Sequence, residues 1–103
     1  MTTVAFFYED GKIVRVCADG HSGYGSEGDD IVCAAVSTLV QTAYLALKDI
    51  GVETVYTRSD GRFEFSIDCQ PKLRRDADVI LRAIEVGLRD LQSGYPQHIK
   101  LEV

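Results

Sequence analysis

Cys33 and His21 are the two residues of this sequence whose types and positions could together carry nucleophilic chemistry. A cysteine thiolate attacks carbonyl carbon, and a nearby histidine can take the thiol proton and later return it to a leaving amine. We expect a helix to start at Asp29 or Asp30, which places Cys33 about three residues into it. Free backbone N–H groups and the helix dipole at that end favour a thiolate and could hold the oxyanion formed by its attack. The pair is therefore a candidate catalytic dyad.

The other candidate residues have plainer interpretations. Cys17 and Cys69 lie on or at the end of expected strands with no titratable partner nearby in sequence, and most such cysteines are buried and inert. Asp30 could be a plain N-cap, or it could orient His21, and both roles could hold together. His98 is expected on the polar face of the last strand, in contact with water. Three serines lack a second histidine to activate them and are expected to be loop and helix residues without a catalytic role: Ser22, Ser26 and Ser37.

The segment between His21 and Cys33 is rich in glycine, which predicts a long flexible loop. Loops of that length are often functional, and we expect this one to act as a lid whose closure positions His21. The expected lid residues are Ser22, Gly23, Tyr24, Gly25, Ser26, Glu27 and Gly28. Glycines before a helix are also typical of phosphate-binding loops. Such loops end in Gly-Lys-Ser/Thr, however, and Asp29 and Asp30 would repel phosphate here.

The charge pattern argues against a nucleic-acid partner. The chain has a net charge of −5, and no Lys or Arg occurs from Val16 to Leu47. Nucleic-acid binding needs cations that replace the counterions on phosphate. An acidic surface around the site would instead favour a basic peptide or protein.

Cysteine usage and hydropathy predict a soluble protein of the cytoplasm. Three cysteines at wide spacings do not describe a disulfide framework, and no CxxC pair or local histidine cluster suits zinc, so we expect no metal and no cofactor. The longest apolar stretch, Ile31 to Leu47, contains several hydroxyl and amide side chains and fits a buried helix better than a membrane span. We therefore expect no membrane partner. No signal peptide is visible at the start of the sequence.

The rest of the pattern predicts an α+β fold in the order β-β-α-β-β-α-β. Asp-Gly steps between apolar runs, at residues 10–11 and 60–61, indicate two hairpins. The expected strands are residues 3–8, 13–18, 52–58, 62–68 and 98–103, and the helices cover 31–50 and 79–91. The first helix should bury a broad face of Ile31, Ala35, Leu39, Ala43, Ala46, Leu47 and Ile50. A length of 103 residues predicts one domain, residues 1–103. Because hairpins dominate over βαβ crossovers, we expect a mostly antiparallel sheet packed with two helices.

One block of sequence carries a family resemblance. The step Gly20-His21, a Gly-rich loop and then the run from Gly28 to Ser37 (GDDIVCAAVS) resemble the bacterial ribosomal-processing cysteine proteases of the Prp family. Members of that family remove a short N-terminal extension from a large-subunit ribosomal protein, cutting after a hydrophobic, aromatic-containing segment. The resemblance implies a homodimer, a lid that is mobile until substrate arrives, and a dyad of His21 and Cys33 with Asp30 at the helix start. Ser22 stands where the family commonly has alanine, a small-for-small change.

We therefore expect a cysteine endopeptidase that cleaves a ribosomal protein precursor through a Cys33 acyl-enzyme. The alternative is a non-catalytic module that binds a basic, hydrophobic peptide during ribosome assembly. A redox-sensing thiol is a third possibility, and it would react with peroxide without cutting a peptide. Thiol reactivity and cleavage separate the three, because a binding module has no reason to keep Cys33 activated.

Overall fold

The computed structural model describes the backbone of residues 1–20 and 27–103. It describes the side chains of residues 1–20 and 31–103. Its elements follow the expected order, so the α+β prediction is confirmed. They are β1 (Thr2–Glu9), β2 (Lys12–Gly20), α1 (Glu27–Asp49), β3 (Glu53–Ser59), β4 (Arg62–Asp68), the short 3-10 helix η1 (Pro71–Leu73), α2 (Arg74–Gly94) and β5 (Ile99–Glu102). The second helix extends further in both directions than its apolar repeat indicates.

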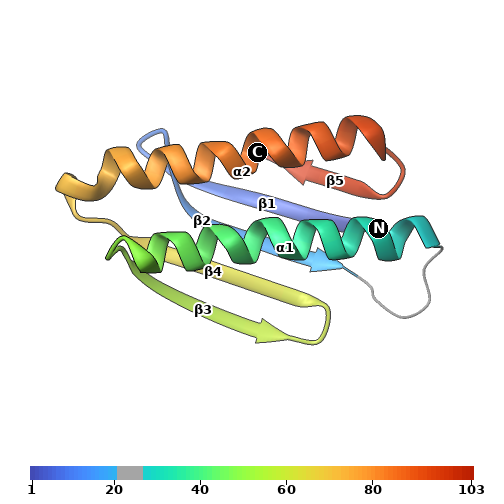
Figure 1. Cartoon of the computed structure of the whole chain (residues 1–103), viewed down its shortest axis with the longest axis horizontal. Coiled ribbons are helices and arrows are strands. Elements are labelled where there is room, and N and C mark those ends of the chain that lie inside the picture. Colours follow the sequence, from blue (N-terminus) through green and yellow to red (C-terminus); the bar gives the residue numbers. More distant parts are fainter. Residues whose placement is uncertain (21–26) are drawn as a thin grey trace.

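The five strands form one sheet in the order β3-β4-β2-β1-β5. β3–β4, β4–β2 and β2–β1 are antiparallel pairs, whereas β5 lies parallel to β1. Figure 1 shows α1 and α2 side by side over one face of the sheet. Because β2 and β4 are neighbours, the end of β2 lies beside the turn that joins β3 to β4, although the two are far apart in sequence.

Both hairpins turn at the Asp-Gly steps that the sequence indicates. In the β1–β2 turn, Asp10 and Gly11 both have positive φ, 53° and 75°, as a type I′ hairpin turn requires. The β3–β4 turn is also two residues long, since Ser59 pairs with Arg62, and its Gly61 has a φ of 72°. Glycine adopts this backbone region without steric cost, so Asp-Gly specifies both reversals.

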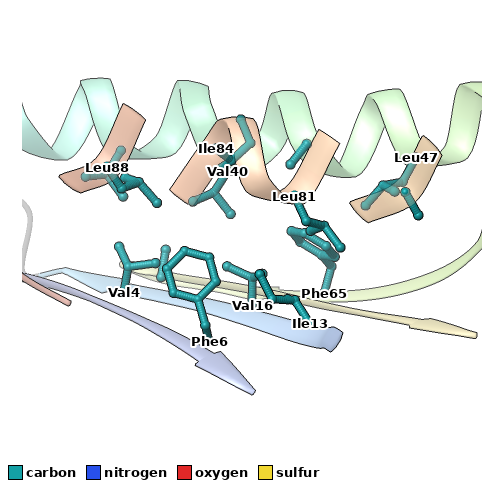
Figure 2. Packing of buried hydrophobic residues seen from close by; sticks show 14 of the residues in the cluster. Val4, Phe6, Ile13, Val16, Val40, Leu47, Phe65, Leu81, Ile84 and Leu88 are labelled. Atoms are coloured by element: carbon teal, nitrogen blue, oxygen red, sulfur yellow. The ribbon is translucent and has the colours of Figure 1, made fainter. Parts of the chain in front are cut away.

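The core lies between the sheet and the two helices, and the sheet's side of it comes from alternate strand positions. Val4, Val16 and Phe65 are almost fully buried, and Val16 is paired with Phe65 across β2 and β4. Figure 2 shows these side chains beneath those of the helices, among them Val40 of α1 and Leu88 of α2. The strands that supply these residues therefore turn alternate side chains toward the core.

The buried face of α1 differs from the expected one. Its buried residues are Val32, Val36, Val40, Ala43 and Leu47. Ile31, by contrast, is 51% exposed, and Leu39 packs only partly against the core. The expectation was right for Ala43 and Leu47 but wrong for the first half of the helix. Apolar residues lie on more than one face there, so two sets of positions one residue apart both fit the helical period. The structure buries the positions that carry the row of valines, whose side chains fill the space above the sheet.

Residues Ile31–Asp49 of α1 are long and apolar enough to cross a membrane, with a mean hydropathy of 1.5. In this fold a third of that window is buried inside the protein, where it covers the sheet. The apolar character of α1 thus serves the core, as expected from its interspersed hydroxyl and amide groups.

Candidate active site

Cys33 lies in the second turn of α1, not at its first turn as expected. The helix begins at Glu27, so Asp29 and Asp30 lie within it and neither is its N-cap. The free backbone N–H groups belong to the first four helical residues, whereas the N–H of a residue in the second turn is used inside the helix. The expected thiolate and oxyanion stabilisation by N–H groups at Cys33 therefore does not follow from its place in the helix.

The expected lid is also shorter than predicted, because Glu27 and Gly28 already belong to α1. Its other residues, 22–26, and His21 lie outside the described residues. The same holds for the side chain of Asp30, so its orienting role stays a prediction.

A hollow of about 470 Å³ opens beside Cys33, which is half-buried and carries a free thiol. The wall on one side is α1, and on the other side it is made by the ends of β1 and β2 and by the β3–β4 turn. The lining residues are Thr2, Ala18, Gly20, Cys33, Val36, Ser37, Val40, Gln41, Arg58, Ser59, Asp60, Gly61, Arg62 and Phe63. Four separate segments of the chain thus enclose the space in front of the thiol.

Gly20 links this hollow to His21. Gly20 is buried at the end of β2, lines the same hollow as Cys33, and immediately precedes His21 in the sequence. Its backbone N–H donates a hydrogen bond of 2.8 Å to the carbonyl oxygen of Gly61. The chain that carries His21 therefore leaves from the wall of the hollow that contains the thiol.

One stripe of α1 extends the site away from Cys33. Ser37 and Gln41 follow Cys33 at four-residue steps and line the hollow with it, and Tyr44 comes next on the same face. The ring centroid of Tyr44 lies 4.9 Å from that of Tyr56 on β3 and 5.9 Å from that of Phe63 on β4. We call Tyr44, Tyr56 and Phe63 the aromatic cluster. Since Phe63 also lines the hollow, the two surfaces are continuous.

The sequence interpretation missed this stripe, although its spacing was a usable signal. Ser37 has no second histidine to activate it and was therefore given no role, yet it borders the hollow. The i, i+4, i+8 spacing of Cys33, Ser37 and Gln41 places all three on one helix face. The opposite wall of the hollow comes from β3 and β4 and could not be predicted from this spacing.

The rim of the hollow is not uniformly acidic. Arg58 and Arg62 line it together with Asp60, so the β3–β4 hairpin brings cations to a segment of α1 that has none. Arg62 is paired with Glu64 at 2.9 Å and with Asp19 at 3.6 Å. The expectation of an acidic surface around the site did not include these two arginines, because it counted charges along the sequence and not across the sheet.

The remaining candidates lie away from the hollow. Cys17 is buried on β2 and paired in register with Glu64, and burial raises the pKa of its thiol. The Sγ of Cys69, just after β4, lies 3.4 Å from the carbonyl oxygen of Gln70. His98 precedes β5 and is half-buried, so it is not a fully solvated strand residue as expected. Its carbonyl oxygen accepts a hydrogen bond from the N–H of Thr2.

Comparison with known proteins places this chain in one family. The family described as cysteine protease Prp matches residues 1–100. The chain is 30% identical over 97 residues to the ribosomal processing cysteine protease Prp of Staphylococcus aureus, covering 90% of this chain and 89% of that protein. It is 28% identical over 91 residues to the protein of the same name from Bacillus subtilis, covering 80% and 78%.

Solved structures agree. The ribosomal processing protease Prp from S. aureus in complex with a substrate peptide superposes with a TM-score of 0.85 at 28% identity, covering 99% of this chain and 98% of that one. The same protease with a covalently linked product peptide gives a TM-score of 0.80 at 29% identity, with the same coverage. The chain therefore belongs to the cysteine protease Prp family and is a cysteine protease.

Proposed function

We propose that this protein is an endopeptidase that removes an N-terminal extension from a large-subunit ribosomal protein, with Cys33 as nucleophile and His21 as acid and base. One observation carries the proposal. Cys33 faces a hollow whose wall includes Gly20, the residue that leads directly into His21. The S. aureus structures support it, since one structure of that protease holds a substrate peptide and the other a covalently linked product peptide.

The proposed reaction runs through a thioester. His21 takes the proton from Sγ of Cys33, and the thiolate attacks the carbonyl carbon of the scissile bond. When the C–N bond breaks, the imidazolium gives its proton to the departing amine, and the acyl group stays on sulfur. His21 then removes a proton from water, which attacks the thioester. The new carboxyl terminus leaves, and the thiol regains its proton.

The groove along α1 supports a hydrophobic substrate segment. From Cys33 it runs past Ser37 and Gln41 to the aromatic cluster, in which Tyr56 is 51% exposed. An extended peptide that lay in this groove would place apolar side chains against the rings and its scissile bond at the thiol. Arg58, on the rim of the hollow, is placed to form an ion pair with an acidic group of the same peptide.

We further propose that the protein acts in the cytoplasm as a homodimer without a nucleic-acid or membrane partner. The outer face of α1 supports the dimer. Between Ile31 and Leu45 its exposed positions are all uncharged: Ile31, Ala34, Thr38, Thr42 and Leu45. Lys48 and Asp49, in the last turn of the helix, are exposed and charged. The two threonine hydroxyls donate to carbonyl oxygens one turn earlier, at 2.9 and 2.6 Å. The threonines therefore present mainly their methyl groups, and a second copy could cover this face.

The test is cleavage read by intact mass. Purified protein is incubated with an N-terminally extended ribosomal protein under reducing conditions, beside the variants Cys33→Ala and Cys69→Ala. We expect one truncation by the wild type and by Cys69→Ala, whose thiol lies outside the hollow, and none by Cys33→Ala. Cleavage by Cys33→Ala would remove Cys33 from the mechanism. Binding without cleavage by the wild type would favour the peptide-binding alternative, which the family's protease activity otherwise disfavours.

A further inference from the structure

The backbones of Gly20 and Gly61 approach each other more closely than a side chain would allow. Besides the hydrogen bond from the Gly20 N–H to the Gly61 carbonyl oxygen, a Cβ atom built on Gly61 would lie 2.4 Å from the carbonyl oxygen of Gly20. An ordinary contact begins at 3.4 Å, so any side chain at Gly61 must displace one of the two backbones by about 1 Å.

On its other side, Gly20 is held by β1. Thr2 pairs with Gly20 in the β1–β2 register, and a Cβ atom on Gly20 would come within 2.9 Å of the Thr2 Oγ1. Thr2 is itself buried and fixed, because its N–H donates to the carbonyl oxygen of His98 at 2.9 Å. Gly20 is thus enclosed between the start of β1 and the β3–β4 turn.

This enclosure matters because His21 comes directly after Gly20 in the chain. Consecutive Cα atoms are about 3.8 Å apart, so the position of Gly20 limits where residue 21 begins. Thr2, Gly20 and Gly61 line the same hollow as Cys33. A displacement of Gly20 would therefore move the origin of the His21 segment relative to the thiol.

We propose that Gly61 is a positioning residue for His21: the β3–β4 turn holds Gly20 against β1, and this anchor sets the point from which His21 reaches Cys33. The proposal rests on the dyad put forward above. It assigns a catalytic purpose to a hairpin turn that is forty residues from His21 in sequence and holds no nucleophile, acid or base of the dyad.

The chain offers a matched control for the test. Gly11, in the β1–β2 turn, has a φ of 75° against 72° for Gly61, but a Cβ atom there meets nothing within 4 Å. Gly11→Ala and Gly61→Ala therefore carry the same backbone strain, and they differ in the contact with Gly20. Gly11 also lies at the end of β1 and β2 opposite the hollow.

Two quantities are measured for the wild type, both glycine variants and His21→Ala. The first is cleavage, for which we expect kcat/KM of Gly61→Ala to fall about a hundredfold, mainly in kcat, because a misplacement of about 1 Å costs that much. Gly11→Ala should stay within about twofold of the wild type. The second is the pH profile of Cys33 alkylation by iodoacetamide, followed by peptide mapping. The alkylation profile of Gly61→Ala should move away from that of the wild type and toward that of His21→Ala.

A second pair of variants tests the same anchor through a side-chain contact, which the fold tolerates more easily. In Gly20→Ala the new Cβ atom presses on the Oγ1 of Thr2. Adding Thr2→Ala removes that oxygen and the methyl group, so that among the side-chain atoms of residue 2 only the Cβ, at 3.5 Å, remains beside residue 20. We expect about a tenfold loss of kcat/KM in Gly20→Ala and recovery in the double variant. If Gly61→Ala shows no cooperative thermal transition, it does not fold, and this second pair of variants becomes the test of the proposal.

Three results would overturn the proposal: cleavage by Gly61→Ala within about threefold of Gly11→Ala, an alkylation profile of Gly61→Ala that superposes on the wild type, or no recovery in the double variant. If the proposed dyad of His21 and Cys33 is itself wrong, the experiment gives a different result. In that case His21→Ala itself would leave both cleavage and the alkylation profile of the wild type unchanged.

Discussion

The three cysteines of this chain occupy three different surroundings. Cys33 is half-buried and faces the hollow, Cys17 is buried on the sheet face turned away from the helices, and Cys69 follows β4. Each is a free thiol. Their chemistry must therefore be set by burial and by neighbouring charge, since the side chain itself is the same in all three.

Cys17 should be the slowest of the three thiols to react. Its pKa is raised chiefly by burial and further by Glu64, against a lowering effect of Arg62. A raised pKa leaves less thiolate at neutral pH, so we expect Cys17 to be alkylated at least about tenfold more slowly than Cys69 at pH 7.5. The difference should narrow as the pH rises above the ordinary thiol range. Peptide mapping after timed exposure to iodoacetamide measures both rates, and equal rates at pH 7.5 would contradict the argument.

Residue types were easier to predict here than residue surroundings. The pairing of a helix cysteine with a histidine before a Gly-rich segment was visible in sequence, and so was the contrast between Cys33 and Cys17. The walls of the hollow were not, because Gly61 and Arg58 reach it only through the β4–β2 pairing. Contacts of that kind depend on sheet order, which local patterns do not encode.

At the scale of elements, a buried carboxylate joins the first strand to the second helix. Glu85 of α2 is 6% exposed and accepts hydrogen bonds from the Tyr8 hydroxyl at 3.0 Å and from Arg89 Nε at 3.2 Å. Arg82 lies 3.6 Å away. With these partners the charge is compensated, and the end of β1 is tied to the helix that covers it.

Tyr8→Phe should weaken this tie in a pH-dependent way. Removing the hydroxyl should lower the free energy of unfolding by about 1 kcal/mol at pH 8. Burial, followed by the hydrogen bond to Glu85, raises the pKa of Tyr8 from its ordinary value of 10.0. The contribution of the protonated phenol is therefore complete below pH 10 and is lost as the pH rises through the folded-state pKa. Urea unfolding of both proteins at pH 8 and above pH 10 checks this, and a difference that stays constant with pH would contradict it.

The elements themselves were largely predictable, for physical reasons that differ between them. Asp-Gly fixes both hairpin turns through the positive φ of Gly11 and Gly61. The start of α1 was misplaced by two residues or more, because several residues of the Glu27–Asp30 segment could begin a helix. The buried face of the first half of α1 was misjudged because apolar residues lie on more than one face there, and only packing against the sheet selects Val32, Val36 and Val40.

At the scale of the whole molecule, two surfaces outside the site differ sharply. The sheet face turned away from the helices carries ion pairs, such as Arg15 with Glu64 at 3.5 Å and Lys100 with Glu102 at 3.8 Å. A partner that covered this face would have to remove water from these charged groups. The outer face of α1 has no charge from Ile31 to Leu45. If two copies associate, contact through the outer face of α1 removes far less bound water than contact through the charged face of the sheet.

The dimer proposal can thus be tested at one exposed side chain. Leu45, 60% exposed on the outer face of α1, should tolerate aspartate in the monomer but not in an interface, where an unpaired charge would be buried. We expect Leu45→Asp to weaken dimerisation at least about tenfold. Val79→Asp is the matched control, because Val79 is 64% exposed on α2 and lies outside the proposed interface. Sedimentation equilibrium of the three proteins gives the dissociation constants. A monomeric wild type, or equal constants for the two variants, would exclude α1 as the dimer contact, whereas a selective loss in Leu45→Asp would place the dimer contact on the helix that carries Cys33.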